Sequence, residues 1–409
     1  MNPSSHDPPS HRRGDNVGPF ELIALLGQGG GGEVWRARMP GQPLDVALKL
    51  LRDDWTPRAL DRFLAEARAA AGLDHPHLVQ VLDFGVDERA AAPVPYLAMD
   101  LATGGTLTEA SLDQTLGGTP TWQALHEAVG QVMDGLAHAH ARGVVHLDVK
   151  GDNVLRGTVT DGRVGWRVVD FGIAHAAGHV PTDARVSGTP THMAPEQWQA
   201  DPHDLGPWTD VYALGCTVWE LVTGAPLYDG GVMQQAVAHA AGRLPRLLPL
   251  LPVPDDLPRW LARALQTQPG DRFRHMADAA AAWQSLGEAR TPSAPLAVVD
   301  PLPARPSLPP LPAGWHRAVA PPTPLSMGGL GLGVLTARRP PLIGRHTARD
   351  RLWVALRSLV EEGRGGRLWL HGAPGVGTSR LAQWVGELAE THGVARCLTV
   401  RHEPGVSDG

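Results

Sequence analysis

Cysteine is scarce in this chain, and positive charge is not in excess. The 409 residues include two cysteines, Cys216 and Cys397. Two cysteines so far apart cannot build a disulfide framework or a zinc site, and they fit a reducing compartment. The formal net charge of -6 leaves the chain without the basic field by which proteins bind nucleic acid, so we expect no nucleic acid partner.

Long apolar runs are missing as well. Residues 1–16 are polar and proline-rich, without the apolar core of a signal peptide. The apolar stretch at residues 327–335 falls well short of the ~20 residues that a membrane-spanning helix needs. We therefore expect no membrane segment and a cytoplasmic protein.

The chain does contain enough apolar sequence to fold. Hydrophobic residues make up 43% of it and charged residues 19%, which favours buried cores over disorder. Strand-like runs come first, and runs with helical periodicity follow at residues 60–73, 121–143 and 209–224. This order predicts an α+β fold with a β-rich lobe and an α-rich lobe.

Proline divides the chain into parts. Eleven of the 34 residues from 291 to 324 are prolines, which is typical of an extended linker. The predicted parts are a disordered N-terminus at residues 1–17, a folded domain at 18–287, a proline-rich linker at 288–341 and the start of a further domain at 342–409. In that last part we expect a helix, a buried strand at residues 366–371, a glycine-rich turn and a second helix.

A glycine-rich stretch near the N-terminus has the spacing G-x-G-x-x-G-x-V. Its residues are Gly27, Gly29, Gly32 and Val34. Glycine lets backbone N–H groups approach phosphate oxygens, although a flexible hairpin explains the stretch equally well. Lys49, on a predicted strand, lies where it can reach the same phosphates, and Glu66 on the next helix can orient its ammonium. Either residue alone is more typical of an exposed surface.

Two polar clusters follow. The segment HLDVKGDN supplies His146, Asp148, Lys150 and Asn153, and the segment VVDFG supplies Asp170, Phe171 and Gly172. Together with the glycine-rich stretch, Lys49, Glu66 and the segment GTPTHMAPEQ at residues 188–197, they give six motifs in one order. Over about residues 18–287 the chain therefore resembles the eukaryotic-type protein kinases, in particular the bacterial serine/threonine kinases.

The resemblance implies a bilobal protein kinase fold that uses ATP and Mg²⁺, with Mn²⁺ as an alternative. Asp148 would orient the substrate hydroxyl and accept its proton, and Lys150 would lie beside the transferred phosphoryl group. Asn153 and Asp170 would hold the metal ion, since hard cations prefer oxygen ligands. Phe171 would pack between the lobes.

The resemblance also assigns the nucleotide site. Its residues would be Gly27, Gly29, Gly32, Val34, Ala47, Lys49, Met99, Asp100 and Ala102. Met99 would be the gatekeeper, and residues 100–102 would form the hinge that receives adenine.

Four further residues would form the scaffold of the site. Thr189 would contact Asp148 and Lys150. Glu196 would pair with Arg272, and Asp210 would brace the loop that carries Asp148.

The sequence departs from the family at Leu147. Most relatives have an arginine there, which receives a phosphorylated residue of the activation loop. Phosphoryl transfer does not itself need that arginine, so we expect an active enzyme, with decay to an inactive kinase fold as the alternative. Gly31 stands where an aromatic residue commonly covers the phosphates. His192 replaces a tyrosine, either as a pH-sensitive group or as an ordinary hydrogen-bonded histidine.

Residues 371–381 resemble the P-loop of signalling ATPase domains that follow some bacterial kinase domains. Gly372, Gly377 and Ser379 match the motif, but Thr378 replaces its lysine. We expect no hydrolysis there, and weak nucleotide binding and no binding both stay open. About 30 residues follow, too few for a complete nucleotide-binding sheet, so we expect a fragment of a longer protein.

Competing functions follow from these motifs. The favoured one is a serine/threonine protein kinase that acts on protein hydroxyls, including its own. The alternative is a catalytically weak ATP-binding kinase-fold scaffold that regulates the attached ATPase-type signalling module. A weaker third hypothesis makes the C-terminal ATPase the output and the kinase its regulator. The sequence leaves the substrate, the activating signal and the oligomeric state open.

Overall fold

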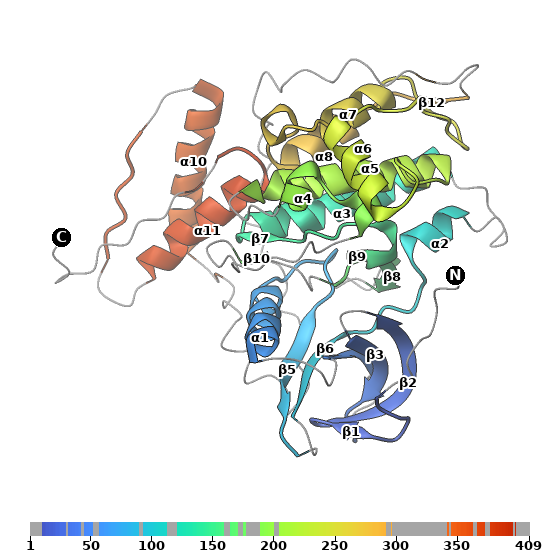
Figure 1. Ribbon diagram of the computed structural model, residues 1–409. Helices are drawn as coiled ribbons and strands as arrows, with labels where there is room; N and C mark the ends of the chain where they lie inside the picture. The colour runs from blue at the N-terminus through green and yellow to red at the C-terminus, as the bar shows by residue number, and fades with distance from the viewer. Residues whose placement is uncertain are drawn as a thin grey trace.

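The computed structural model has a β-rich N-terminal lobe and a helical C-terminal lobe (Figure 1). This arrangement confirms the two-lobed α+β fold. The described residues are 10–29, 32–41, 45–51, 57–89, 93–112, 121–158, 164–170, 175–176, 189–199, 204–291, 296, 342, 345–362, 366–372, 377–395 and 397.

A six-stranded antiparallel sheet builds the N-terminal lobe, in the order β1-β2-β3-β4-β6-β5. Its strands are β1 (Asn16–Val17), β2 (Phe20–Gly29), β3 (Gly32–Arg38), β4 (Asp45–Leu50), β5 (Val81–Asp87) and β6 (Val94–Asp100). Helix α1 (Pro57–Ala71) packs against β5. Along β4, Val46, Leu48 and Leu50 enter the core of the lobe, so Ala47 and Lys49 face the other side of the sheet.

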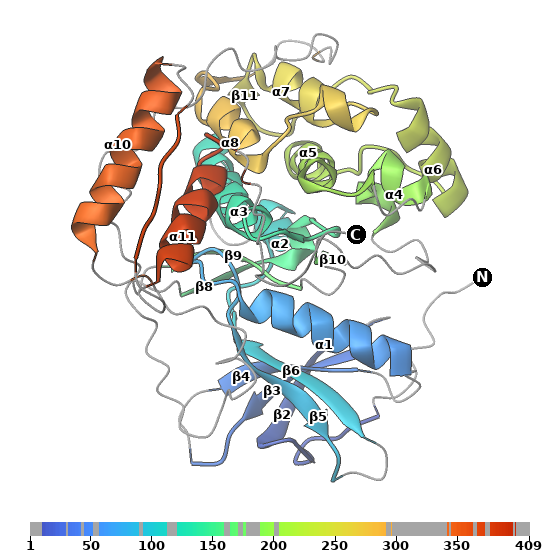
Figure 2. The same ribbon diagram turned by 90° about the vertical axis from the view of Figure 1, so that its left-hand side faces the viewer.

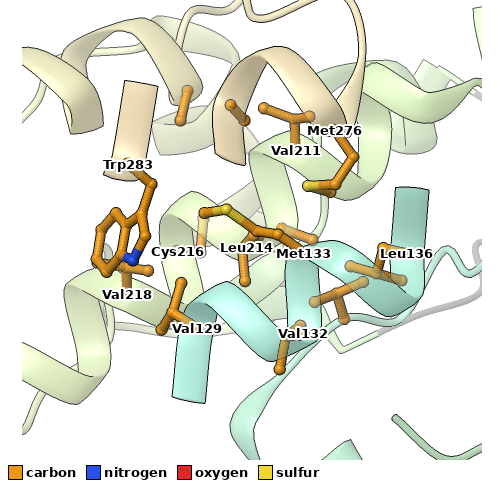
Figure 3. Packing of buried hydrophobic residues seen from close by; sticks show 14 of the residues in the cluster. Val129, Val132, Met133, Leu136, Val211, Leu214, Cys216, Val218, Met276 and Trp283 are labelled. Atoms are coloured by element: carbon orange, nitrogen blue, oxygen red, sulfur yellow. The ribbon is translucent and has the colours of Figure 1, made fainter. Parts of the chain in front are cut away.

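Helices α3 (Trp122–His140) and α5 (Pro207–Thr223) form the centre of the C-terminal lobe, as the periodicity predicted. Met133, Leu136, Leu214 and Trp283 pack between these helices and their neighbours (Figure 3). Helix α5 is buried on nearly every face and ends at Gly224, whose φ of 71° suits a glycine. The surrounding helices are α2 (Leu107–Leu112), α4 (Pro195–Gln199), α6 (Val232–Ala241), α7 (Leu257–Ala264) and α8 (Met276–Gln284).

Short elements occupy the junction of the lobes and the edge of the C-terminal lobe. The strand pairs are β7 (Val144–Val145) with β10 (His175–Ala176), β8 (Val154–Thr158) with β9 (Val164–Val168), and β11 (Val253–Pro254) with β12 (Ala289–Arg290). The 3₁₀ turns are η2 (Gly151–Asn153), η3 (Pro190–His192) and η5 (Pro269–Asp271). Figure 1 shows β8 and β9 next to the N-terminal lobe, so the polar clusters lie where the lobes meet.

Segments outside the predicted central domain also have structure. Residues 10–17, within the segment predicted to be disordered, form a turn and strand β1. At the start of the predicted linker, β12 pairs with β11, and Leu296 forms a bridge with Leu247. Residues 1–9 and 297–341 lie outside the described residues.

Two helices after the predicted linker match the prediction. They are α10 (His346–Glu362) and α11 (Thr378–Thr391), with a small core around Leu381 and Trp384 between them. Helix α11 also lies against α3 of the C-terminal lobe (Figure 2). No helix in the described part of the chain is long and apolar enough to cross a bilayer.

The prediction of a buried strand at residues 366–371 is wrong. Residues 366–372 contain no strand, and the side chains of Leu368 and Trp369 are 53% and 75% exposed. A strand needs partners for its backbone groups, and no described segment pairs with this one. An apolar run alone does not show whether the described part of the chain offers a strand to pair with it.

A buried ion pair joins α4 to the turn before α8. Arg272 donates to the Glu196 carboxylate from Nη1 at 2.7 Å and from Nη2 at 2.8 Å. It also donates to the carbonyls of Trp208, Gln266 and Thr267. The predicted pairing of Glu196 with Arg272 is confirmed.

Replacing Arg272 by alanine should lower the free energy of unfolding by about 3–5 kcal/mol, because a buried carboxylate loses its counter-charge. Urea unfolding followed by circular dichroism measures the change. Arg274→Ala, at an exposed neighbour, should cost less than ~0.5 kcal/mol. Equal losses in the two variants would show that the pair does not stabilise the lobe.

Candidate active site

The two polar clusters and the strand lysine meet at the junction of the lobes. Lys49 on β4 donates from Nζ to Oδ1 of Asp170, which follows β9. Asp170 has a φ of 63°, a left-handed conformation that costs a non-glycine residue free energy. The N–H of Val169 donates to the carbonyl of Asn153 at 2.9 Å, so Asn153 and Asp170 lie on adjoining segments.

Four donors surround the carboxylate of Asp148. Asn153 Nδ2 and Lys150 Nζ each lie 3.0 Å from Oδ2. The backbone N–H and the hydroxyl of Thr189 each donate to Oδ1 at 2.8 Å. Lys150 Nζ also donates to Thr189 Oγ1 at 2.6 Å, so the predicted contacts of Thr189 are confirmed.

These donors set the charge of Asp148. Burial alone would raise the pKa of this carboxyl, but the charge of Lys150 and the hydrogen bonds from Lys150 and Thr189 outweigh it, and the pKa lies below its usual value. Asp148 is therefore ionised at neutral pH, as a proton acceptor must be.

A second carboxylate braces the loop that carries Asp148. Asp210, on α5, is fully buried and accepts the backbone N–H groups of His146 at 2.8 Å and Leu147 at 2.7 Å. His140 Nε2 at the end of α3 lies 2.7 Å from the same carboxylate. The bracing role predicted for Asp210 is confirmed.

Leu147 is fixed through its backbone. Its φ is 65°, its N–H is held by Asp210, and its carbonyl accepts from Gln197 Nε2 at 2.9 Å. The side chain is 3% exposed and packs in the interior. It presents no charge to a phosphate group, in agreement with the departure noted in the sequence.

Strand pairing places the predicted nucleotide residues on one side of the sheet. Val34 lies opposite Lys49, and Ala47 lies opposite Met99. Gly27 pairs with Val34 across the β2–β3 hairpin.

The third glycine of the motif is required by its position. Gly32 has a φ of 129°, and a Cβ on it would lie 1.9 Å from the carbonyl oxygen of Leu50. It pairs with Gly29, while Gly30 and Gly31 lie outside the described residues.

The predicted hinge, residues 100–102, begins at the last residue of β6. The N–H of Asp100 donates to the Gln80 carbonyl, and its carboxylate pairs with Arg167 Nη2 at 2.8 Å. Ala102 packs beside Gly157 of β8. The N–H of Asp100 is thus already used in a hydrogen bond within the protein.

Asn153 and Asp170 have the chemistry to hold a hard divalent cation. The amide nitrogen of Asn153 is bound to Asp148, so its amide oxygen is the atom that a metal would use. The Asp170 carboxylate is 45% exposed. Within the described ranges no group of three His, Cys, Asp or Glu side chains could hold a metal, so the amide oxygen and substrate phosphates would complete the ligand set.

Some predicted contacts fall outside the described part of the chain. The side chain of Glu66 on α1 is one, so its pairing with Lys49 stays a prediction. The others concern Phe171, Gly172 and residues 177–188.

His192 has a structural explanation. Its Nε2 lies 3.0 Å from Glu220 Oε2, and its Nδ1 lies 2.9 Å from Thr191 Oγ1. The hydrogen bond from His192 lowers the pKa of Glu220. These contacts favour the simpler interpretation, a hydrogen-bonded histidine in the segment next to Thr189.

The sequence analysis missed two residues that position the site. His140 lies outside every motif, and only its place at the end of a helix before the polar cluster could have drawn attention to it. Gln197 is the last residue of the segment GTPTHMAPEQ, but the motif gave it no role.

Both lysines of the chain lie in this site. The sequence contains only two, Lys49 and Lys150, and the ammonium groups of both contact carboxylates of this site. Arginine supplies the remaining basic side chains among the 36.

Comparisons with known proteins agree with this geometry. Residues 20–266 match the protein kinase domain family. The chain is 34% identical to the serine/threonine-protein kinase PknB of Mycobacterium leprae, over 69% of this chain and 45% of that protein. It is 31% identical to PknA of Mycobacterium tuberculosis, over 88% of this chain and 78% of that protein. The chain thus spans about half the length of the PknB proteins that it matches.

Solved structures give the same result. The crystal structure of the Mycobacterium tuberculosis PknI kinase domain superimposes with a TM-score of 0.51 at 28% identity, covering 67% of this chain and 98% of that one. The chain belongs to the protein kinase family, and its kinase domain is of the bacterial serine/threonine type.

Proposed function

We propose that the kinase domain transfers the γ-phosphoryl group of ATP to serine and threonine hydroxyls of proteins, including hydroxyls of the same chain. The observation that carries the proposal is the ionised Asp148 carboxylate, held by donors from Asn153, Lys150 and Thr189. The Lys49–Asp170 ion pair adds a contact between the lobes at the same junction.

Asp148 would act as the base in this reaction. The acceptor oxygen bonds to the γ-phosphorus, the bond from that phosphorus to the β–γ bridging oxygen breaks, and the hydroxyl proton passes to Asp148. The hydroxyl of Thr189 already donates to Asp148 at 2.8 Å, which supports the proposal because an acceptor hydroxyl needs the same kind of contact. Lys150 would balance charge on the transferred group.

Asn153 and Asp170 would hold Mg²⁺, or Mn²⁺ in its place. The bound cation supplies charge neutralisation at the phosphates of ATP. Lys49 would bind these phosphates from β4, and the glycine-rich hairpin would cover them. Met99, Asp100 and Ala102 would contact adenine.

Leu147 bears on regulation. Because a buried apolar side chain replaces the arginine, we propose that activity does not require phosphorylation of residues 177–188. The loop that carries Asp148 is instead held by Asp210 and Gln197.

A second proposal concerns residues 342–409, which we assign as the start of a P-loop ATPase-like module. Gly377, with a φ of 83°, directly precedes helix α11, as a glycine-rich turn into a phosphate-facing helix requires. Thr378 brings no positive charge, so nucleotide binding would rest on backbone amides alone. Arg142 Nη2 lies 3.4 Å from Glu387 Oε2 of α11, a contact that joins this segment to the kinase domain.

Transfer of label from γ-labelled ATP tests the proposed activity. Asp148→Asn should lower kcat by about 10²–10⁴-fold because the base is lost, and Lys49→Met should abolish incorporation at ordinary ATP concentrations. Asp152→Asn, at an exposed position of the same loop, is the matched control and should behave like the parent.

Two results would reject the proposed kinase activity. One is undiminished incorporation in Asp148→Asn. The other is a parent chain that binds ATP without any transfer, which would instead support the scaffold function.

The pH profile tests the charge of Asp148. Its lowered pKa keeps it ionised at neutral pH, so kcat should fall only when the pH drops through that lowered value. Lys150→Met removes the charge that does most to lower the pKa, so the acidic limb of the kcat profile should move to higher pH. A limb that does not move, measured over pH 4–8 in the variant, would exclude Asp148 as the titrating base.

Alanine at both Thr182 and Ser187 tests the role of Leu147. We expect most of the activity to remain, because no arginine next to Asp148 waits for a phosphate. A kcat more than about a hundredfold lower, or ~2.7 kcal/mol in barrier height, would contradict this expectation.

A further inference from the structure

Glu33 is a buried carboxylate at the edge of the glycine-rich hairpin. It follows Gly32 as the second residue of β3 and is 5% exposed. Neighbouring residues of a strand point to opposite faces, so Glu33 lies on the face away from Val34 and Lys49. Its carboxylate is thus behind the surface that would meet the nucleotide.

Three polar groups contact this carboxylate, and two of them come from the N-terminal segment. Trp35 Nε1 donates to Oε2 at 2.8 Å from within β3. The backbone N–H of Ser10 donates to Oε1 at 2.5 Å, and His11 Nδ1 lies 3.3 Å from Oε2. Ser10 and His11 precede residue 20, where the match to the kinase family starts.

The segment that brings Ser10 and His11 to Glu33 is itself anchored. Arg12 and Asp15 form a turn, with the N–H of Arg12 donating to Asp15 Oδ2 at 2.7 Å. The N–H of Gly14 donates to the Leu22 carbonyl at 2.8 Å, and the N–H of Leu22 donates to the Asp15 carbonyl at 2.9 Å. Strand β1 then continues along β2. Residues 10–17, which we name the N-terminal strap, therefore run from β2 to the start of β3.

We propose that the N-terminal strap positions the glycine-rich hairpin for ATP, with the Ser10 N–H and the His11 ring as positioning groups. The inference rests on the proposed function, since it assigns the hairpin to the phosphates. A glycine-rich loop loses much conformational freedom when it closes on a ligand. Glu33 directly follows Gly32, and both lie next to Leu50, the neighbour of Lys49 on β4. Holding the Glu33 side chain therefore holds this end of the hairpin, so part of the ordering is present before ATP binds.

Loss of the strap would leave the Glu33 carboxylate with only Trp35 among the partners that the described residues provide. A buried carboxylate that loses donors costs free energy, and turning the side chain toward water would relieve that cost. The start of β3 would then move, and the hairpin with it.

The test compares variants of the full chain that differ by one donor. Ser10→Pro removes the backbone N–H, whereas Ser10→Ala keeps it. His11→Ala removes the ring, whereas His11→Asn keeps a side-chain donor near the position of Nδ1. Arg13→Ala changes an exposed residue of the strap that does not reach Glu33 and serves as the control.

Two measurements are made on each variant. The first is amide hydrogen exchange of residues 24–38 without nucleotide. The second is the KM for ATP together with kcat and Tm, supported by the affinity for a fluorescent ATP analogue. Exchange and analogue affinity do not require turnover, so they remain decisive for the strap even if the parent chain transfers no phosphoryl group.

We expect Ser10→Pro and His11→Ala to raise the KM for ATP about tenfold, equal to ~1.4 kcal/mol, and to speed exchange of the hairpin. Their kcat should stay within about twofold of the parent because the chemistry is untouched. Their Tm should fall by no more than roughly 10 °C, because one hydrogen bond to a buried carboxylate is lost and the fold is kept. Ser10→Ala and His11→Asn should resemble the parent. Equal exchange and equal analogue affinity in Ser10→Pro and Ser10→Ala would overturn the proposal.

Discussion

The buried Asp210 carboxylate is the constraint on which the geometry of the candidate active site depends. Helix α5 is apolar on nearly every face, and in such surroundings the hydrogen bonds of a carboxylate are strong and an unpaired one is costly. Asp210 takes donors from His146, Leu147 and His140 and so ties the loop to two central helices. The left-handed backbone of Leu147 costs about 1–2 kcal/mol, while hydrogen bonds to a charged acceptor contribute about 1.5–3 kcal/mol each, so the loop conformation is favoured.

The N-terminal lobe uses a similar device. Glu33, like Asp210, is a buried carboxylate that accepts a backbone N–H from a segment distant in sequence. Asp210 fixes the loop with the candidate base, and Glu33 fixes the strand that returns from the glycine-rich hairpin. In both places a carboxylate inside the protein orders a loop at its surface.

Much of the fold and the site could be predicted from the sequence, because the motifs are short and local. Asp148, Lys150 and Asn153 lie within one segment, so their mutual contacts follow from their spacing once the loop conformation is known. The contacts of Thr189 and the pairing of Glu196 with Arg272 required the family resemblance, since residues far apart in sequence give no local signal.

Other features had no sequence signal that could be read in advance. The strap contact depends on a backbone N–H, which every residue except proline has, so Ser10 could not be distinguished from its neighbours. At residues 366–371 the sequence signal was present but the strand was not. An apolar run is visible in the sequence whether or not partner strands exist to pair with it. Local patterns thus identify chemistry and periodicity but not the partners that long-range contacts supply.

The confinement of lysine to the candidate site has a consequence for covalent chemistry. Reagents and enzymes that modify side-chain amines, such as acylating probes or acetyltransferases, find on this chain only the Nζ atoms of Lys49 and Lys150. Each of these atoms is in contact with a carboxylate of the candidate site. Acylation of either lysine would therefore neutralise a charge inside the candidate site, so lysine-directed modification would report on this site.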